Sequence, residues 1–255
     1  MFVKRMIAQR TPLYRAALDV RAKCDYIKIR KTRSAANRVT HYCISPYKTA
    51  TTYVSNIFSE YRVAHEPLHY VTLRHIDDVK FLRRRRAYLD LDLECTGAFC
   101  ESIPIMREAF PEARFLFIIR HPQSWIQSTL NYYENFFPGI NYIYLSSLFY
   151  KKHGVANVDR FFQIDEESRV RTVKSLLEMW LRVYQAARRD TNSLIIKLEE
   201  IDSRLGDIES FLGMKSANAE RAWRHKGKLT QKISLADYVD LDPYRADVAE
   251  LGYEL

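Results

Sequence analysis

The chain has 255 residues, of which 47% are hydrophobic and 28% are charged, and its formal net charge is +9. This length and apolar content suit one α/β domain with additional peripheral segments. Folding of such a domain buries roughly 70–75% of the surface that the unfolded chain exposes. The four cysteines show no C-x-x-C spacing, which argues against a disulfide framework and against a zinc site, and we expect no metal.

The net charge belongs to the N-terminal arm, residues 1–38. This arm contains eleven Lys or Arg and two Asp, whereas residues 39–255 contain 29 basic and 29 acidic residues. Such an arm can contact anionic lipid, nucleic acid or an acidic polymer, or it can be a solvated helical lead-in. No apolar run is long enough for a signal peptide or a membrane span. We therefore expect a cytoplasmic protein, either free or peripheral to the inner face of a membrane.

Within the arm, a helix is predicted to begin near Pro12, and the basic run over 28–38 connects it to the first core strand. This strand is buried and begins near Val39. It leads into a tight turn, Pro-Tyr-Lys-Thr-Ala-Thr-Thr at 46–52, and then into a helix over about 51–60. The order strand, turn and helix is the setting in which backbone N–H groups can bind an anion.

The side chains of the turn favour an anion as well. Lys48 adds a full positive charge, and three threonines add hydroxyl donors, namely Thr49, Thr51 and Thr52. No glycine occurs between residues 1 and 94, whereas the P-loop of nucleoside triphosphate enzymes requires two. The turn therefore predicts a site for a phosphate-like group that is not an ordinary P-loop.

A second, short strand is predicted to end at His65 and Glu66, where Pro67 stops it. Glu66 is either a surface carboxylate at a strand end or a general base, with His65 and His69 as nearby rivals for that role. Residues 70–86 look helical and end in four arginines, which suit the dipole of a helix C-terminus or the recognition of an acidic acceptor. A strand over 87–93 and a turn over 94–98 are expected to follow.

The apolar run Phe115–Ile119 predicts a central parallel strand that is covered on both faces. Arg120 follows at its carboxyl end, where ligands bind in open α/β sheets. Pro122 is expected to start a helix, which places Ser128 about two turns into it. A guanidinium at this place offers a fork that matches a phosphate group.

The second half of the chain supplies decorations and the last core elements. Residues 132–165 are rich in aromatics, and we interpret them either as a lid or acceptor-binding insertion or as a packed helical subdomain. Apolar spacing predicts an amphipathic helix over 166–189, followed by a strand over 194–198 and a helix that closes at Leu212. Residues 231–255 are expected to pack on the domain as a tail.

The order of these elements and motifs resembles that found in the sulfotransferases that use 3′-phosphoadenosine-5′-phosphosulfate. The turn at 46–52 resembles their 5′-phosphosulfate loop, with Ala50 in place of the usual glycine, so either the dihedral angle is not left-handed here or the loop is strained. Arg120 and Ser128 match the family's 3′-phosphate motif. Lys226 and Gly227 match the C-terminal loop that closes over the same phosphate, although a histidine precedes them where arginine is usual.

The resemblance spans residues 39–230 and implies a P-loop-like, three-layer α/β/α fold with a central parallel sheet. It implies two catalytic residues: Glu66 takes a proton from the acceptor hydroxyl, and Lys48 stabilises the leaving 3′,5′-adenosine bisphosphate. The implied donor-binding residues are Pro46, Tyr47, Lys48, Thr49, Ala50, Thr51, Thr52, Tyr53, Arg120, Ser128, Lys226 and Gly227. Candidate acceptor-binding residues are His65, His69, Asp92, Glu94, Tyr132 and Tyr133.

The acceptor is the least determined part of this prediction. Glu66 followed by Pro67 is similar to the carbohydrate-acting branches of the family, so a saccharide or glycolipid is favoured over a small-molecule or lipid alcohol. A nucleotide kinase of the same fold class is one alternative function. A non-enzymatic binder of nucleic acid or anionic membrane through residues 1–38 is another, although we expect no nucleic acid partner for the enzyme.

Overall fold

The computed structural model describes residues 12–32, 38–135, 146–217 and 231–255. These residues form two compact units. The sheet unit lies within residues 21–120 and 183–225, and the helical unit lies within residues 1–20, 121–182 and 226–255. Across the described segments, no helix combines the length and the apolar character that crossing a bilayer requires.

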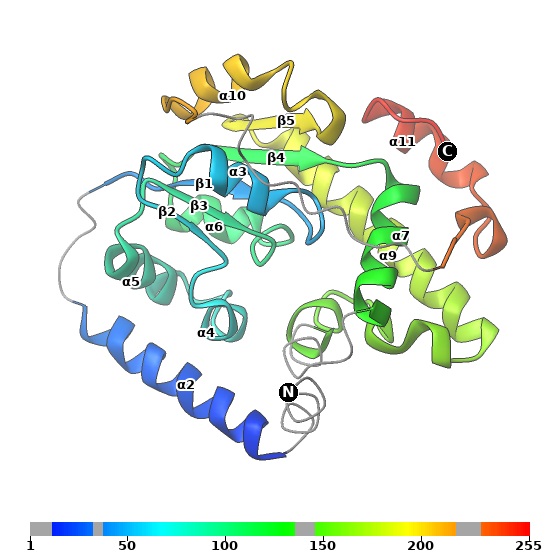
Figure 1. Ribbon diagram of the computed structural model, residues 1–255, viewed down its shortest axis with the longest axis horizontal. Coiled ribbons are helices and arrows are strands. Elements are labelled where there is room, and N and C mark those ends of the chain that lie inside the picture. Colours follow the sequence, from blue (N-terminus) through cyan, green and yellow to red (C-terminus); the bar gives the residue numbers. More distant parts are fainter. Residues whose placement is uncertain (1–11, 33–37, 136–145, 218–230) are drawn as a thin grey trace. The chain divides into compact units, whose positions relative to one another are not determined.

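The sheet unit is built on five parallel strands in the order β2-β3-β1-β4-β5 (Figure 1). The strands are β1 (His41–Ile44), β2 (Val63–His65), β3 (Leu93–Thr96), β4 (Phe115–Ile119) and β5 (Ser193–Lys197). Helices flank the sheet, so the predicted α/β fold with a central parallel sheet is confirmed. The buried run predicted at Phe115–Ile119 is β4 with the same bounds, and all five of its residues are buried.

One face of the sheet is covered by α3 (Thr51–Ile57) and α10 (Leu205–Leu212). Val54 and Ile57 of α3 belong to the same buried cluster as Cys43, Leu116 and Ile196 of the strands. Successive strand residues point to opposite faces, so a strand that is apolar at every position must be covered on its other face too.

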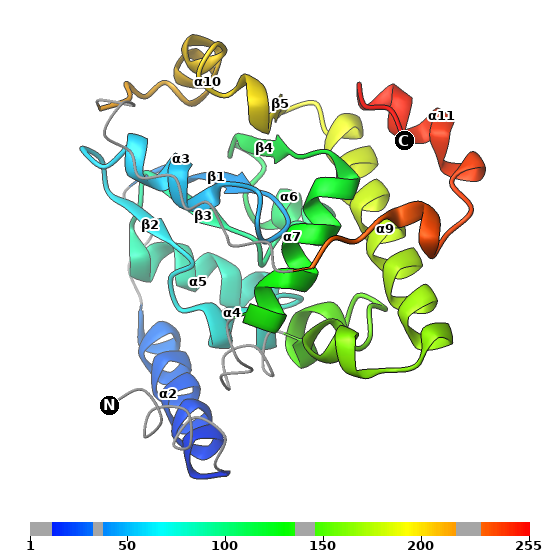
Figure 2. The same ribbon diagram turned by 45° about the vertical axis from the view of Figure 1, so that its right-hand side comes forward.

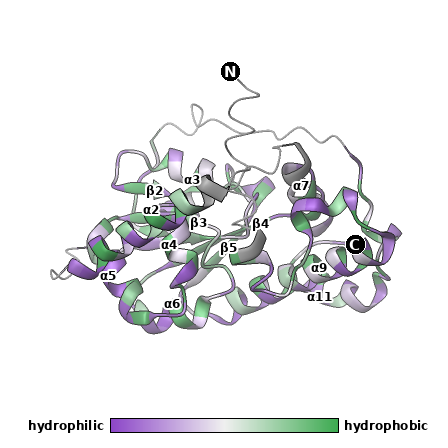
Figure 3. Ribbon diagram, turned by 90° about the horizontal axis from the view of Figure 1, so that it is seen from below, coloured by the Kyte–Doolittle hydropathy of each residue, from purple (hydrophilic) through white to green (hydrophobic). Residues whose placement is uncertain are grey.

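That other face is covered by aromatic residues and by α6 (Ile103–Ala109). The ring of Tyr42 stacks on Phe110 at 5.4 Å and meets Phe99 edge-on at 5.9 Å. Helix α5 (Val79–Leu89) packs against α6. Figure 3 shows the mixed hydrophilic and hydrophobic colouring of α5, whose Phe81 is buried while Arg84 is exposed.

Two boundaries predicted between residues 70 and 93 are wrong. The single helix over 70–86 is two helices, α4 (His69–Arg74) and α5, because Asp78 starts the second one by accepting a hydrogen bond from the backbone N–H of Phe81. The strand expected over 87–93 begins only at Leu93. Residues 87–89 continue α5, which ends where Asp90 adopts a left-handed conformation.

Helix α2 (Pro12–Lys31) begins at the predicted proline and is longer than the sequence pattern indicated. Figures 1 and 2 both draw the C-terminal end of α2 just below α5. Ile29 is fully buried, and the ring of Tyr26 stacks on His75 at 4.3 Å. From Arg21 onwards, therefore, the basic helix is an integral part of the sheet unit.

The helical unit contains α7 (Pro122–Asn135), which begins at the predicted proline, and most of α9 (Glu166–Arg189), whose last turns lie in the sheet unit. The C-terminal residues pack on α7: Leu235 donates its N–H to Gln123 at 2.8 Å, and His121 lies 2.7 Å from the carbonyl of Glu254. Among the described residues of this unit, α11 (Arg245–Glu250) is a further helix, and Ser146–Tyr150, Val158–Gln163, Leu235–Asp237 and Asp242–Tyr244 are short turns of helix. The short turn Leu198–Glu200 belongs to the sheet unit.

Candidate active site

The turn after β1 is held in an uncommon backbone conformation. Lys48 and Ala50 have φ angles of 74° and 66°, both in the left-handed region. The alternative of a strained loop at Ala50 is therefore the one that the structure adopts, at a cost of about 1–2 kcal/mol relative to glycine. Thr49 stabilises the turn, because its buried hydroxyl donates a hydrogen bond to the backbone carbonyl of Pro46 at 2.5 Å.

Two cations meet at the carboxyl edge of the sheet. Lys48 follows β1, Arg120 follows the neighbouring strand β4, and the Nη1 atom of Arg120 donates to the carbonyl of Lys48 at 3.3 Å. Burial lowers the pKa of Lys48, and the charge of Arg120 lowers it further. An anion bound between the two would relieve this repulsion, so the arrangement favours a negatively charged ligand.

The hydroxyls that open α3 face the end of β2. The Nε2 atom of His65 lies 3.1 Å from Thr51 Oγ1 and 3.1 Å from Thr52 Oγ1. Because α3 has only seven residues, we attribute anion binding to side chains and not to the helix dipole. Tyr53, the last residue of the predicted loop, is buried in the core and donates its hydroxyl to Asp202 at 2.8 Å.

Glu66 lies directly after β2 at the same edge of the sheet. Its φ angle is 51°, and its N–H donates to the carbonyl of Cys95 at 2.9 Å, which fixes the backbone. Burial raises the pKa of its carboxyl to about 7, and the charge of Glu94 adds to this, whereas a backbone hydrogen bond from Gly97 lowers it. Since 23% of the side chain is exposed, the carboxyl is desolvated but still open to a small molecule.

The side chain of His69, which is 14% exposed, lies next to Glu66. The Nδ1 atom of His69 lies 3.3 Å from Glu66 Oε2, and its Nε2 atom lies 3.4 Å from the hydroxyl of Tyr47. Burial lowers the pKa of His69 to about 4, helped by the charges of Arg85 and His65. His69 is therefore neutral when Glu66 ionises and does not compete for the proton at neutral pH. Its Nδ1 atom lies near the carboxyl but makes no hydrogen bond with any residue that the structure describes.

Sequence reasoning missed two residues that hold this cluster. Gly97 leaves room for the ring of Tyr47, because a Cβ atom at residue 97 would lie 2.7 Å from that ring. Arg85 is buried and donates to both carboxylate oxygens of Glu94, at 2.6 and 2.7 Å, and to the carbonyl of Pro67 at 2.7 Å. Nothing in a run of four arginines marks its third member as buried, so the solvated helix end expected there was wrong for Arg85.

The other predicted site residues are held in ion pairs, belong to the helical unit or lie outside the described chain. Glu94 is held in the buried pair with Arg85, and Asp92 pairs with Arg38 at 2.9 Å. Ser128 is buried in α7, in the helical unit, and Tyr132 is half-buried there. Tyr133 is also in α7, but its side chain is outside the described part, as are Lys226 and Gly227. Within the described residues, no group of three or more His, Cys, Asp or Glu could hold a metal ion.

No family model matches the sequence, and no curated protein is similar to it. Among solved structures, a sulfotransferase from Alicyclobacillus acidocaldarius is 12% identical, with a TM-score of 0.48, and the match covers 86% of this chain and 98% of that chain. The sulfotransferase domain from the Synechococcus PCC 7002 olefin synthase is 11% identical, with a TM-score of 0.45 and coverage of 88% and 97%. Similarity at this distance specifies neither a donor nor an acceptor.

Proposed function

We propose that this protein is a sulfotransferase that transfers a sulfo group from 3′-phosphoadenosine-5′-phosphosulfate to a hydroxyl of an acceptor. The supporting observation is that Lys48, Arg120 and Glu66 follow three strands of one parallel sheet at the same edge. Two cations suit an anionic donor, and a desolvated carboxyl with a pKa of about 7 suits a general base at neutral pH.

The donor carries a 5′-phosphosulfate and a 3′-phosphate, and different residues bind each of these groups. In this proposal the hydroxyls of Thr51 and Thr52 hold the 5′-phosphosulfate, whereas Lys48 acts on the leaving group. We assign Arg120 to the 3′-phosphate, and the family resemblance implies the same role for Ser128, Lys226 and Gly227. The chemical fit is that of ammonium, guanidinium and hydroxyl donors to phosphate oxygens.

The reaction then needs one proton transfer and one displacement at sulfur. Glu66 takes the proton from the acceptor hydroxyl, whose oxygen bonds to sulfur in line with the breaking bond between sulfur and the bridging oxygen. Lys48 stabilises the negative charge that grows on that bridging oxygen as 3′,5′-adenosine bisphosphate leaves. Donors aimed at developing charge supply the largest single part of such a rate enhancement.

Calorimetric titration with 3′,5′-adenosine bisphosphate, with ATP as the control, tests the proposal. We expect tight binding of the bisphosphate and little response to ATP, because the loop lacks the glycines of a triphosphate site. The reverse preference would favour a nucleotide kinase, and binding of neither would refute the donor site.

Two substitutions separate the roles of the cations. Lys48→Ala should lower kcat by about 10²–10³-fold with little change in bisphosphate affinity, because its charge acts on the leaving group. Arg120→Ala should instead weaken bisphosphate binding about tenfold or more. Small and equal effects of both substitutions would contradict the assignment.

A second candidate function is contact with an anionic membrane through α2. The observation that favours it is the exposure of two apolar residues, Val20 and Ile27, on a helix whose last turn carries Lys28, Arg30 and Lys31. Sedimentation with vesicles of anionic and of neutral lipid tests this contact. Binding to the anionic vesicles that is lost in a Val20→Ser, Ile27→Ser variant would support it, and equal sedimentation with both lipids would refute it.

A further inference from the structure

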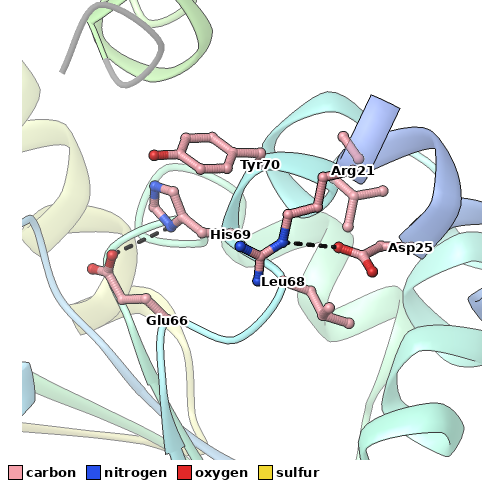
Figure 4. Close-up of a pocket in the computed structure, with 8 residues that line it drawn as sticks. Arg21, Asp25, Glu66, Leu68, His69 and Tyr70 are labelled. Atoms are coloured by element: carbon pink, nitrogen blue, oxygen red, sulfur yellow. Dashed lines mark ion pairs between the residues drawn. The ribbon is translucent and has the colours of Figure 1, made fainter. Parts of the chain in front are cut away.

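A cavity of about 190 Å³ adjoins Glu66 and is walled partly by α2. The segment after β2 contributes four lining residues, namely Glu66, Leu68, His69 and Tyr70 (Figure 4). Helix α2 contributes Arg21 and Asp25. All of these residues belong to the sheet unit. The α2 helix, which the sequence set apart as a basic arm, thus reaches the cavity into which the candidate base opens.

The size of the cavity limits what can enter it. Sites for drug-sized ligands have volumes of about 300–1,000 Å³, so 190 Å³ suits a single ring or a short chain and not an extended ligand. Any larger acceptor would place one ring beside Glu66 and leave the rest outside. The cavity therefore selects the group that carries the reacting hydroxyl.

Polar groups stand on both sides of this cavity. Figure 4 shows Glu66 and Asp25 on opposite sides of the view, with Arg21 paired to Asp25. The carboxylate of Asp25 is 16% exposed, and it lies 4.0 Å from Arg21 and 3.9 Å from Lys28. Both distances exceed a hydrogen bond, so the Asp25 oxygens retain lone pairs for hydroxyl donors.

The arrangement of apolar and polar groups suits a sugar ring. Tyr70, Leu68 and Val71 offer an aromatic and aliphatic wall against which the C–H face of a ring can lie. Asp25 accepts hydrogen bonds and Arg21 donates them, so neighbouring hydroxyls can satisfy both at once. A phenol has one hydroxyl, which the reaction at Glu66 uses, so it would bring Asp25 no hydroxyl donor.

We propose, on the basis of the proposed function, that α2 forms a wall of the acceptor site. Arg21 and Asp25 there select a hydroxyl-rich acceptor that presents one sugar ring to the cavity. The reacting hydroxyl faces Glu66, and hydroxyls at the far side of the ring bind Asp25 and Arg21. Asp25 and Arg21 act on acceptor affinity and take no part in the proton transfer.

The test uses the full chain and two measurements. Calorimetry with 3′,5′-adenosine bisphosphate examines the donor site alone. Release of this bisphosphate from 3′-phosphoadenosine-5′-phosphosulfate is then measured with a panel of methyl hexopyranosides as acceptors and with phenol as the comparison. We expect turnover of at least one glycoside and a lower kcat/KM for phenol.

Alanine variants on one helix then locate the acceptor. Asp25→Ala should raise KM for the best glycoside about tenfold or more, the loss expected for a hydrogen bond to a charged group, with kcat and bisphosphate affinity unchanged. Arg21→Ala should raise KM less, because its side chain is 78% exposed. Lys23→Ala is the matched control: it removes a charge from the same helix at a residue that does not line the cavity, and it should change neither parameter.

The outcomes separate this inference from the proposed function. If the bisphosphate does not bind, the donor site is refuted and the acceptor assignment falls with it. If it binds but no glycoside is turned over, or phenol is the better substrate, the acceptor class is refuted while the donor site stands. If a glycoside is turned over and Asp25→Ala leaves its KM unchanged, α2 is not the wall of the acceptor site.

Discussion

Replacing Glu66 by glutamine should stabilise the protein above neutral pH and abolish sulfo transfer. The carboxyl has a pKa of about 7 in the folded protein against an ordinary value of 4.5, because burial disfavours its charge. Between pH 4.5 and 7 the folded state therefore binds more protons at this group than the unfolded state does. Its contribution to the free energy of unfolding falls as pH rises across this window, by about 1.4 kcal/mol per pH unit and about 3 kcal/mol in all.

Glutamine has nearly the same shape and cannot ionise. The difference in unfolding free energy between Glu66→Gln and the wild type should be near zero below pH 4.5 and should approach about 3 kcal/mol above pH 7. The lowered pKa of His69, about 4, gives a slope of opposite sign between pH 4 and 6.5. Comparing the two proteins at each pH removes that slope, because both contain His69.

Urea unfolding followed by tryptophan fluorescence at pH 4.5, 6 and 8 measures this difference. Glu60→Gln, at an exposed residue, is the matched control, and its unfolding free energy should equal that of the wild type at each pH. A difference that does not change with pH would refute the desolvation of Glu66. In the wild type, kcat should rise with pH with a midpoint near 7, since the base must be ionised. Full activity of Glu66→Gln would move the base to His65, His69 or Glu94.

Two further substitutions test the residues that hold the cluster. Gly97→Ala places a Cβ atom 2.7 Å from the ring of Tyr47 and should lower stability by about 1–3 kcal/mol, seen as a lower Tm; an unchanged Tm would mean that the ring moves freely. Arg85→Ala leaves the buried carboxylate of Glu94 without its partner and should cost about 3–5 kcal/mol in urea unfolding, whereas Arg84→Ala, at an exposed neighbour, should cost less than about 0.5 kcal/mol. Similar losses for both arginines would contradict the burial of Arg85.

Local signals were enough for part of this protein. An unbroken apolar run can be satisfied only where both faces are covered, so Phe115–Ile119 predicted a central strand before any contact was known. Pro12 and Pro122 begin their helices because proline fits the first helical turn. The turn at 46–52 likewise carries its cation and hydroxyls in consecutive residues.

The site itself depends on residues that the sequence keeps apart. Arg85 is buried because Glu94 comes from another element, and Gly97 matters because the ring of Tyr47 lies against it. Neither fact has a local signature, since each is decided by which segments the sheet order brings together. For the same reason α2 appeared as a basic arm in the sequence and lines a cavity with Glu66 in the structure. The sequence by itself determined most of the strands and the charges at their ends. Only the tertiary structure decided which of those charges became desolvated, because desolvation depends on what packs around a group.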